Sequence, residues 1–142
     1  MKLEWMALAN YAEDHGGLLT VVGGGWDTIN VQAPIEGAPE GVFAFIQGTL
    51  VVRLLLHSSE TNTGHHLRFE IVDEDGQQLL KADVDFNVPR SRGLPIGWDQ
   101  GANLVFPLTG VTLPRPGNYT INLRVGEELL GDRPFRVLKL FS

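Results

Sequence analysis

Of all the residues in this chain, two histidines and a glutamate near its middle are the most similar to a set of metal ligands. His57 ends one expected strand, His66 opens the next, and Glu60 lies in the short segment between them. If these two strands pair, His57 and His66 become neighbours with Cβ atoms about 5 Å apart. Two imidazoles and a carboxylate suffice to bind zinc or another first-row metal. The alternative is that these side chains line a solvated loop and bind nothing.

Acidic residues gather around the segment that follows. Asp73-Glu74-Asp75-Gly76 precedes Asp83 and Asp85 in the sequence, a grouping that invites comparison with the calcium loops of β-sandwich domains. Calcium needs six to eight oxygens from several loops. Turn chemistry already explains the first group, since Asp and Gly tolerate the backbone of a tight hairpin. Asp83 and Asp85 alternate with Val84 and Phe86, as the wet face of a strand does, so a structural role is favoured.

The segment from Asn87 to Ala102 carries a basic and aromatic mixture and is long for a loop in a compact domain. Arg90, Arg92, Trp98 and Asp99 are residue types enriched where proteins bind partners. A tryptophan in such a loop either plugs the open end of the fold or lies exposed as an anchor. Because burial of the ring stabilises by a few kcal/mol, we expect Trp98 to act as a plug.

Trp26 follows three consecutive glycines, Gly23 to Gly25. A glycine-rich loop can cradle a phosphate, but this one lacks the helix and the lysine that such loops use. We therefore expect the glycines to let a strand bend and Trp26 to pack on one end of the core.

Extended segments must position all of these residues. Alternating apolar residues and turn signals predict about eight or nine strands and no helix. The expected ranges are 2–12, 17–23, 26–32, 42–57, 65–72, 77–86, 103–109, 117–125 and 129–140. The range 42–57 is read as one strand bent at Gly48. Two hairpins are expected, one through 73–76 and one through 126–128.

The last of these hairpins indicates an antiparallel β-sandwich with Greek-key connections. From about Gly48 onward, the strand order, the Asp-Glu-Asp-Gly turn and the element Pro116-Gly117-Asn118-Tyr119 resemble immunoglobulin-like and fibronectin-like domains. In those folds a tyrosine at the start of the penultimate strand often bonds back to nearby backbone. The resemblance implies that Tyr119 occupies this corner and that Pro116 and Gly117 shape the turn before it.

Over its whole length the chain also resembles a bacterial family of domains of unknown function. The resemblance rests on residues 9–13 and 16–26, and on Glu60-Thr61-Asn62 ahead of the strand that contains Arg68-Phe69-Glu70. It implies no activity, because none is attached to the family.

Composition narrows the classes of function. The 142 residues fit a single domain, 1–142, that is large enough to bury a core without a metal or disulfide. A net charge of −6 with only 11 Lys and Arg disfavours nucleic acid and anionic membrane surfaces. The chain has no cysteine, which excludes a disulfide, a thiolate nucleophile and a Cys-bound zinc. With no signal-peptide pattern at the start, we expect a cytoplasmic protein.

These observations favour a non-enzymatic protein-interaction or scaffold domain without a cofactor. No Gly-x-Ser-x-Gly motif or other catalytic constellation is present. We expect an unidentified protein partner or self-association through an exposed strand edge, with 42–56 and 129–140 as the long strands that offer one. Phe141 breaks the alternation of the last strand and is expected to face a second chain. The alternative function is a small-ligand or metal-binding module at His57, Glu60 and His66.

Overall fold

The computed structural model describes residues 1–142 as eleven strands and one 3₁₀ turn, η1, so the all-β class is confirmed. The elements are β1 (Lys2–His15), β2 (Leu18–Trp26), β3 (Thr28–Val31), β4 (Ala44–Phe45), β5 (Thr49–Leu56), η1 (Ser58–Glu60), β6 (Gly64–Asp73), β7 (Gln78–Asn87), β8 (Gln100–Pro107), β9 (Thr112–Leu113), β10 (Gly117–Val125) and β11 (Glu128–Lys139). No helix in the structure has the length and apolar character needed to cross a membrane.

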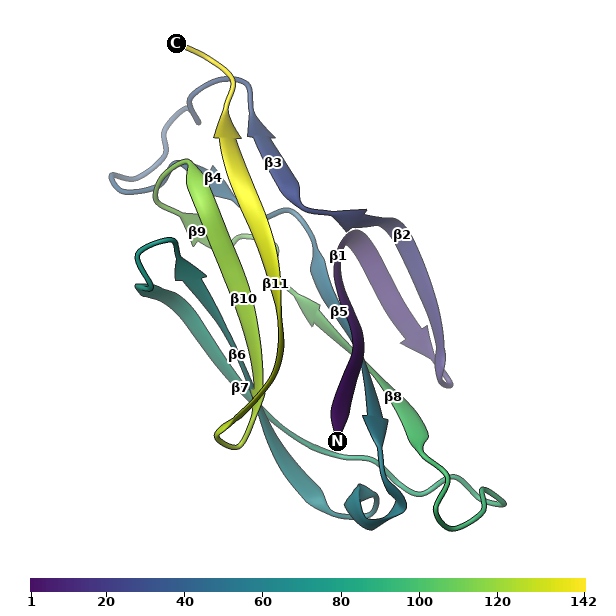
Figure 1. Ribbon diagram of the computed structural model, residues 1–142. Helices are drawn as coiled ribbons and strands as arrows, with labels where there is room; N and C mark the ends of the chain where they lie inside the picture. The colour runs from purple at the N-terminus through teal and green to yellow at the C-terminus, as the bar shows by residue number, and fades with distance from the viewer.

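The strands form two large sheets and one small one (Figure 1). The first sheet has the order β2-β1-β5-β8, the second has the order β3-β11-β10-β6-β7, and β4 pairs with β9. Neighbouring strands are antiparallel except for β3, which runs parallel to β11. The chain changes sheets at Asp27, between β2 and β3. Both expected hairpins, β6–β7 and β10–β11, are confirmed.

The two large sheets face each other across one hydrophobic core. Alternate residues of β5, β6 and β10 point into it, including Leu50, Ile71 and Ile121, each with no exposed surface. The rings of Phe69 in β6 and Phe106 in β8 lie 5.1 Å apart and join the sheets. Burial of these alternating side chains is what selects strands with a period of two.

Strand β1 serves two neighbours in turn. Its first half pairs with β5 and its second half pairs with β2, with a shift of register between Leu8 and Ala9. Ala12 of β1 and Leu19 of β2 then pack against Val51 of β5 and Val105 of β8, in a small cluster separate from the main core. The β1–β2 hairpin therefore lies over the outer side of its own sheet, and Figure 1 shows β2 at the margin of the molecule.

The prediction of one bent strand over 42–57 is wrong, and the strand number rises accordingly. The segment divides into β4 and β5, which belong to different sheets, and the short β9 that pairs with β4 was not expected. Gly48 lies between the two strands, where the backbone of Ala9 and the ring of Trp26 leave no room for a side chain. A Cβ at this position would lie 2.5 Å from the carbonyl oxygen of Ala9 and 2.9 Å from Cζ2 of Trp26.

The pairing of three further segments differs in part from the expectation. The strand that ends at Leu56 and the strand that holds His66 do not pair, because β5 lies in the first sheet and β6 in the second. β5 is not an edge, since it pairs with β1 and β8 along its length, whereas β11 pairs with β3 only over Arg136–Lys139 and has β10 alone as its neighbour over Glu128–Phe135. Phe141 is half-buried, with its ring centroid 6.1 Å from that of Phe43, and its contact with a second chain stays a prediction.

Candidate functional site

The three residues expected to bind a metal have separate partners. His57 caps η1, where its Nδ1 accepts a hydrogen bond from the Ser59 backbone nitrogen at 3.2 Å. Glu60 accepts from the His57 backbone nitrogen at 2.8 Å and from the Met1 nitrogen at 2.6 Å. His66 lies on β6, in the other sheet. No group of three or more His, Asp or Glu side chains is placed to hold a metal, so the expected convergence of His57, Glu60 and His66 does not occur.

His66 instead belongs to a row of charges on the solvent face of β6 and β7. Its Nδ1 lies 2.8 Å from Asp85 and its Nε2 lies 3.0 Å from Asp83, which also accepts from Arg68 at 2.8 Å. The hydrogen bonds to Asp85 and then Asp83 raise the pKa of His66 above its usual value. The hydrogen bond from Arg68 lowers the pKa of Asp83, although slight burial opposes it.

Asp73 is buried and organises the turn between β6 and β7. Its carboxylate accepts from the backbone nitrogens of Asp75 and Gln77 at 3.0 and 2.8 Å, and from Arg115 at 2.6 Å. These donors occupy the carboxylate, which accords with a structural role. At the other end of Arg115's segment, the Tyr119 hydroxyl donates to the Arg115 carbonyl oxygen. Pro116 and Gly117 form the turn between them, with Gly117 at a φ of +140°.

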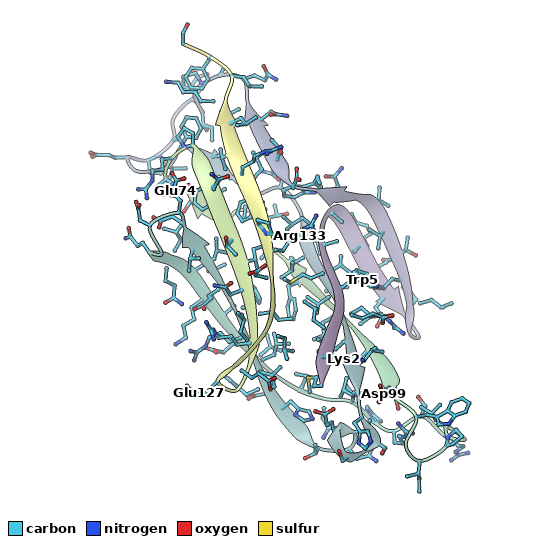
Figure 2. The ribbon with its side chains drawn as sticks, in the orientation of Figure 1. Lys2, Trp5, Glu74, Asp99, Glu127 and Arg133 are labelled. Atoms are coloured by element: carbon cyan, nitrogen blue, oxygen red, sulfur yellow. The ribbon has the colours of Figure 1, made fainter.

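The loop between β7 and β8 is held by Arg90, whose guanidinium donates to the carbonyl oxygens of Pro95 and Trp98. The expectation that Trp98 plugs the fold is wrong: its side chain is 63 % exposed. Arg92 and Asp99 are exposed as well. Figure 2 places Asp99 and Glu74 at opposite ends of the molecule. The loop is therefore an accessible surface, held in shape by backbone carbonyls rather than by the core.

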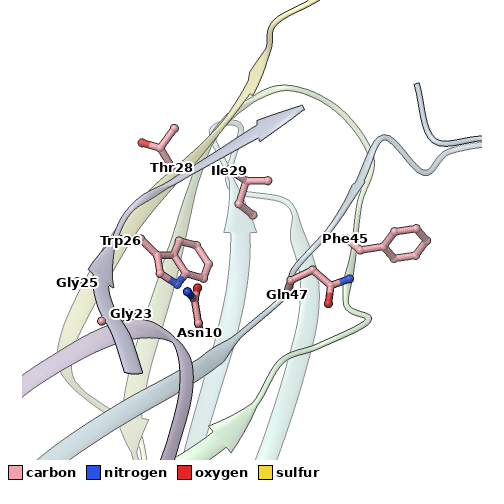
Figure 3. A pocket seen from close by; sticks show the side chains of 9 residues that line it. Asn10, Gly23, Gly25, Trp26, Thr28, Ile29, Phe45 and Gln47 are labelled. Carbon is pink, nitrogen blue, oxygen red and sulfur yellow. The ribbon is translucent and has the colours of Figure 1, made fainter. Parts of the chain in front are cut away.

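Trp26 is half-buried against the main core and lines a cavity of about 570 Å³ where β2 gives way to β3 (Figure 3). The other lining residues carry no charge: Asn10, Gly23, Gly24, Gly25, Thr28, Ile29, Phe45 and Gln47. Trp26 Nε1 is buried and has no acceptor. Asn10 lies so close to Gly23 that a Cβ there would be 2.3 Å from the Asn10 amide nitrogen. The glycine is thus needed for this approach of β1 to β2.

Strand β2 next to this cavity is the most exposed strand of the fold. Seven of its nine residues are exposed, and only Leu19 and Trp26 are half-buried. The apolar side chains of Leu18, Val21 and Val22 are 76 %, 42 % and 54 % exposed. The strand has β1 on one side only, so backbone N–H and C=O groups along its other side lack strand partners.

A family model described as a family of unknown function, DUF6941, matches residues 4–138. The chain belongs to this family. No curated protein matches it significantly. The DUF6941 match includes β2 through β10 completely, so both the β2 edge and the neighbouring cavity lie within the family's domain.

The other edges of this DUF6941 domain are protected in recognisable ways. β7 carries Lys81, Asp83 and Asp85, β3 has only four residues, and the part of β11 that lacks a second strand carries Asp132, Arg133 and Pro134. β8 has no exposed residue before its terminal Pro107. At its other end, Gln100 bonds to the loop before it through Pro89 and Ser91. Charge, shortness, proline and a covering loop are the usual devices that stop edges from pairing.

The sequence of β2 contains none of these devices over its regular part. Leu18 to Val22 has no charge and no proline, and it is rich in β-branched residues. Only its end is irregular, where Gly23 and Gly25 have φ values of +61° and +88°. Sequence reasoning identified the strand but not the edge. The signal that the sequence does contain is the uncharged, apolar run itself. That β2 has a strand on one side only follows from the order of the sheet.

Proposed function

We propose that this DUF6941 domain is a non-enzymatic protein-interaction domain that binds an extended polypeptide segment along the free edge of β2. In such binding, the incoming segment becomes an additional strand, and main-chain hydrogen bonds supply most of the affinity. The observation that carries the proposal is the unprotected run Leu18–Val22 at a sheet margin where every other edge is charged, short or covered.

The chemistry of β2 defines the kind of segment it would accept. Leu18 and Val22 lie on one face of the strand, and Leu19 and Val21 lie on the other. A partner strand with apolar or β-branched side chains would cover Leu18 and Val22 on one face and Val21 on the other. The proposed ligand is therefore an extended, uncharged segment rich in apolar and β-branched residues. Its binding involves no catalytic step.

We further propose that the domain is immunoglobulin-like and acts in the cytoplasm. The order β1-β5-β8 opposite β11-β10-β6-β7 supports the fold relationship, since immunoglobulin domains arrange strands A-B-E and G-F-C-C′ in this way. The hydrogen bond from Tyr119 to Arg115 also supports it. The absence of cysteine fits a reducing compartment.

A strand-forming peptide tests the proposal. Isotopically labelled protein, dilute enough to sediment as a monomer, would be titrated with a synthetic peptide of alternating valine and threonine, with lysines at both ends for solubility. We expect chemical-shift changes and slower amide exchange in β2. A matched peptide with proline at its centre controls for charge, because proline cannot donate to the pairing. Equal effects of the two peptides, or shifts centred on β7 or the 88–99 loop, would refute strand addition at β2.

A further inference from the structure

We infer that the segment accepted by β2 is β2 of a second copy of this chain, paired antiparallel about a two-fold axis at Thr20. The inference rests on the proposed function and names its partner. It requires that β2 be self-complementary in backbone, side-chain shape and charge.

The backbone sets the register. Gly23 and Gly25 have left-handed φ values, which bend the end of β2 and leave Leu18–Val22 as its regular part. Thr20 is the midpoint of this part. A two-fold axis perpendicular to the sheet keeps each face of β2 on the same side in both copies, and it places residues equidistant from Thr20 opposite each other.

This register matches apolar side chains on both faces. Leu18 of one copy lies opposite Val22 of the other, and Leu19 lies opposite Val21. The pair would bring together the two most exposed apolar residues of the strand, Leu18 at 76 % and Val22 at 54 % exposure. Apolar and β-branched cross-strand pairs each stabilise a sheet by about 0.2–1 kcal/mol.

The rows continue into β1 on each side. Tyr11, which is 51 % exposed, pairs with Val22, and His15 pairs with Leu18. The outer face would therefore present Tyr11 and Val22 of one copy beside Leu18 and His15 of the other. The pairing extends an existing aromatic and apolar row across four strands. Thr20 would meet Thr20 at the axis, where paired threonine hydroxyls form a favourable hydrogen-bonded contact.

Charge allows the same register. β2 has no ionisable residue from Leu18 to Trp26, so two copies bring no like charges directly together. The nearest ionisable residues lie in β1, where Glu13, Asp14 and His15 are opposite Thr20, Leu19 and Leu18, and Glu13 is the one level with the two-fold axis. Two Glu13 residues would be separated by three strand spacings, about 14 Å. That distance exceeds the screening length of about 8 Å at physiological salt. A second copy is therefore better matched to this edge than a charged segment.

Single-cysteine crosslinking tests the register in the full chain, which has no cysteine of its own. Direct cross-strand neighbours have Cα atoms about 4.5–5.5 Å apart, within the range that a disulfide spans. Thr20→Cys should thus form a disulfide-linked dimer under mild oxidation. Val22→Cys places the two sulfurs about four residues apart along the strands, roughly 13 Å, which a disulfide cannot bridge. Ile96→Cys, at a 94 % exposed loop position, measures collisional crosslinking.

Sedimentation equilibrium supplies a readout without cysteine. We expect a concentration-dependent dimer that Val22→Lys abolishes, because it places a charge at each end of the paired segment. Ile96→Lys adds the same charge at an exposed apolar residue of the 88–99 loop and should leave dimerisation unchanged. Retained circular dichroism and melting temperature show that Val22→Lys remains folded, as expected for an exposed site.

The outcomes separate the two proposals. Crosslinking at Thr20 well above that at Ile96, together with a dimer lost in Val22→Lys, supports the inference. A chain that stays monomeric while the valine-threonine peptide still adds to β2 overturns the second copy and leaves the proposed function standing. A monomeric chain that also ignores the peptide overturns both. A dimer that survives Val22→Lys, or that crosslinks at Val22 in preference to Thr20, overturns the interface or its register.

Discussion

Strands β2 and β7 are edges of the two large sheets, and they present different chemistry to solvent. β7 carries Lys81, Asp83 and Asp85, with both aspartates bonded to side chains of β6. β2 carries no charge at all, although more of it is exposed. A charged edge resists a new strand because pairing desolvates or opposes its charges. The fold thus has charges that oppose strand pairing at the β7 edge and none at the β2 edge. This difference is expected if β2 pairs with a strand of another polypeptide.

The two edges also differ in how they are supported. β7 borders a sheet whose neighbouring strand β6 contributes Leu67, Phe69 and Ile71 to the main core. Leu19 of β2 packs on a cluster with only three buried residues: Ala9, Ala12 and Val51. We therefore expect the β1–β2 hairpin to open more readily than the rest of the domain, since local stability follows local burial.

Truncation in the two clusters tests this difference and should give the largest effect. Ile71→Ala removes a side chain with no exposed surface and should lower the free energy of unfolding by about 2–5 kcal/mol. Leu19→Ala removes a half-buried side chain and should cost about 1 kcal/mol. Urea denaturation of both variants measures these values. Equal losses would mean that the hairpin is an integral part of the core rather than a lightly supported margin.

The entry to β7 should be the next most sensitive point. Asp73→Ala leaves two backbone N–H groups and Arg115 without their shared acceptor at a site where the side chain is 2 % exposed. A backbone N–H group left without an acceptor costs about 1–3 kcal/mol where it is buried, whereas Arg115, whose side chain is 45 % exposed, regains contact with water. Asp75→Ala is the matched control, because its side chain is 79 % exposed and its contact with Arg115 is 3.3 Å. It should change the melting temperature little.

Local turn chemistry explains which parts of the fold could be predicted from the sequence. The two hairpins could be predicted because the residues that make each turn, 73–76 and 126–128, are adjacent in the chain. The division of 42–57 into β4 and β5 could not be read in this way. It depends on the contact of Gly48 with Ala9 and Trp26, which come from a strand and a glycine run far away in the sequence.

The candidate site was harder to predict for the same reason. His57 and His66 are close in sequence, but the chain between them changes sheets, so proximity in sequence did not become proximity in space. Whether Leu18–Val22 is an edge depends on the positions of β1, β5 and β8, none of which its own residues encode. The prediction for Trp98 was wrong for a different reason. The size of its ring favoured burial, but the loop is held by hydrogen bonds from Arg90 to backbone carbonyl oxygens, and the ring is exposed to solvent.

Removal of the charges from β7 should turn it into a second open edge. The triple variant is Lys81→Thr, Asp83→Thr and Asp85→Thr. With the charges gone and β-branched threonines in place, we expect species larger than the dimer in sedimentation velocity. The control removes the same net charge from exposed loop residues by Glu36→Thr, Glu40→Thr and Arg92→Thr. If only β2-dependent association persists in the triple variant, charge is not what protects β7.

The smallest expected effect is a shift in the titration of His66. Its hydrogen bonds to Asp85 and Asp83 should place its pKa above the ordinary value of about 6.5 in a pH series of NMR spectra. Asp85→Asn should move that pKa down, because it removes the partner with the larger influence. Asp83→Asn should move it down by less, although it also frees Arg68.

The sign of the linkage follows from the raised pKa. The contribution of His66 to stability is complete below the unfolded pKa of about 6.5 and is lost as the pH rises through the higher folded pKa. Over the same interval His66 of β6 loses the positive charge that it holds beside Asp83 and Asp85 of β7, so the net negative charge of this edge and its resistance to pairing should increase. The run Leu18–Val22 has no group that titrates there. A His66 pKa at or below 6.5 would contradict the hydrogen bonds of His66 to Asp83 and Asp85. The charges that oppose pairing at β7 would then be those of its own aspartates and Lys81, and they would not change with pH through His66.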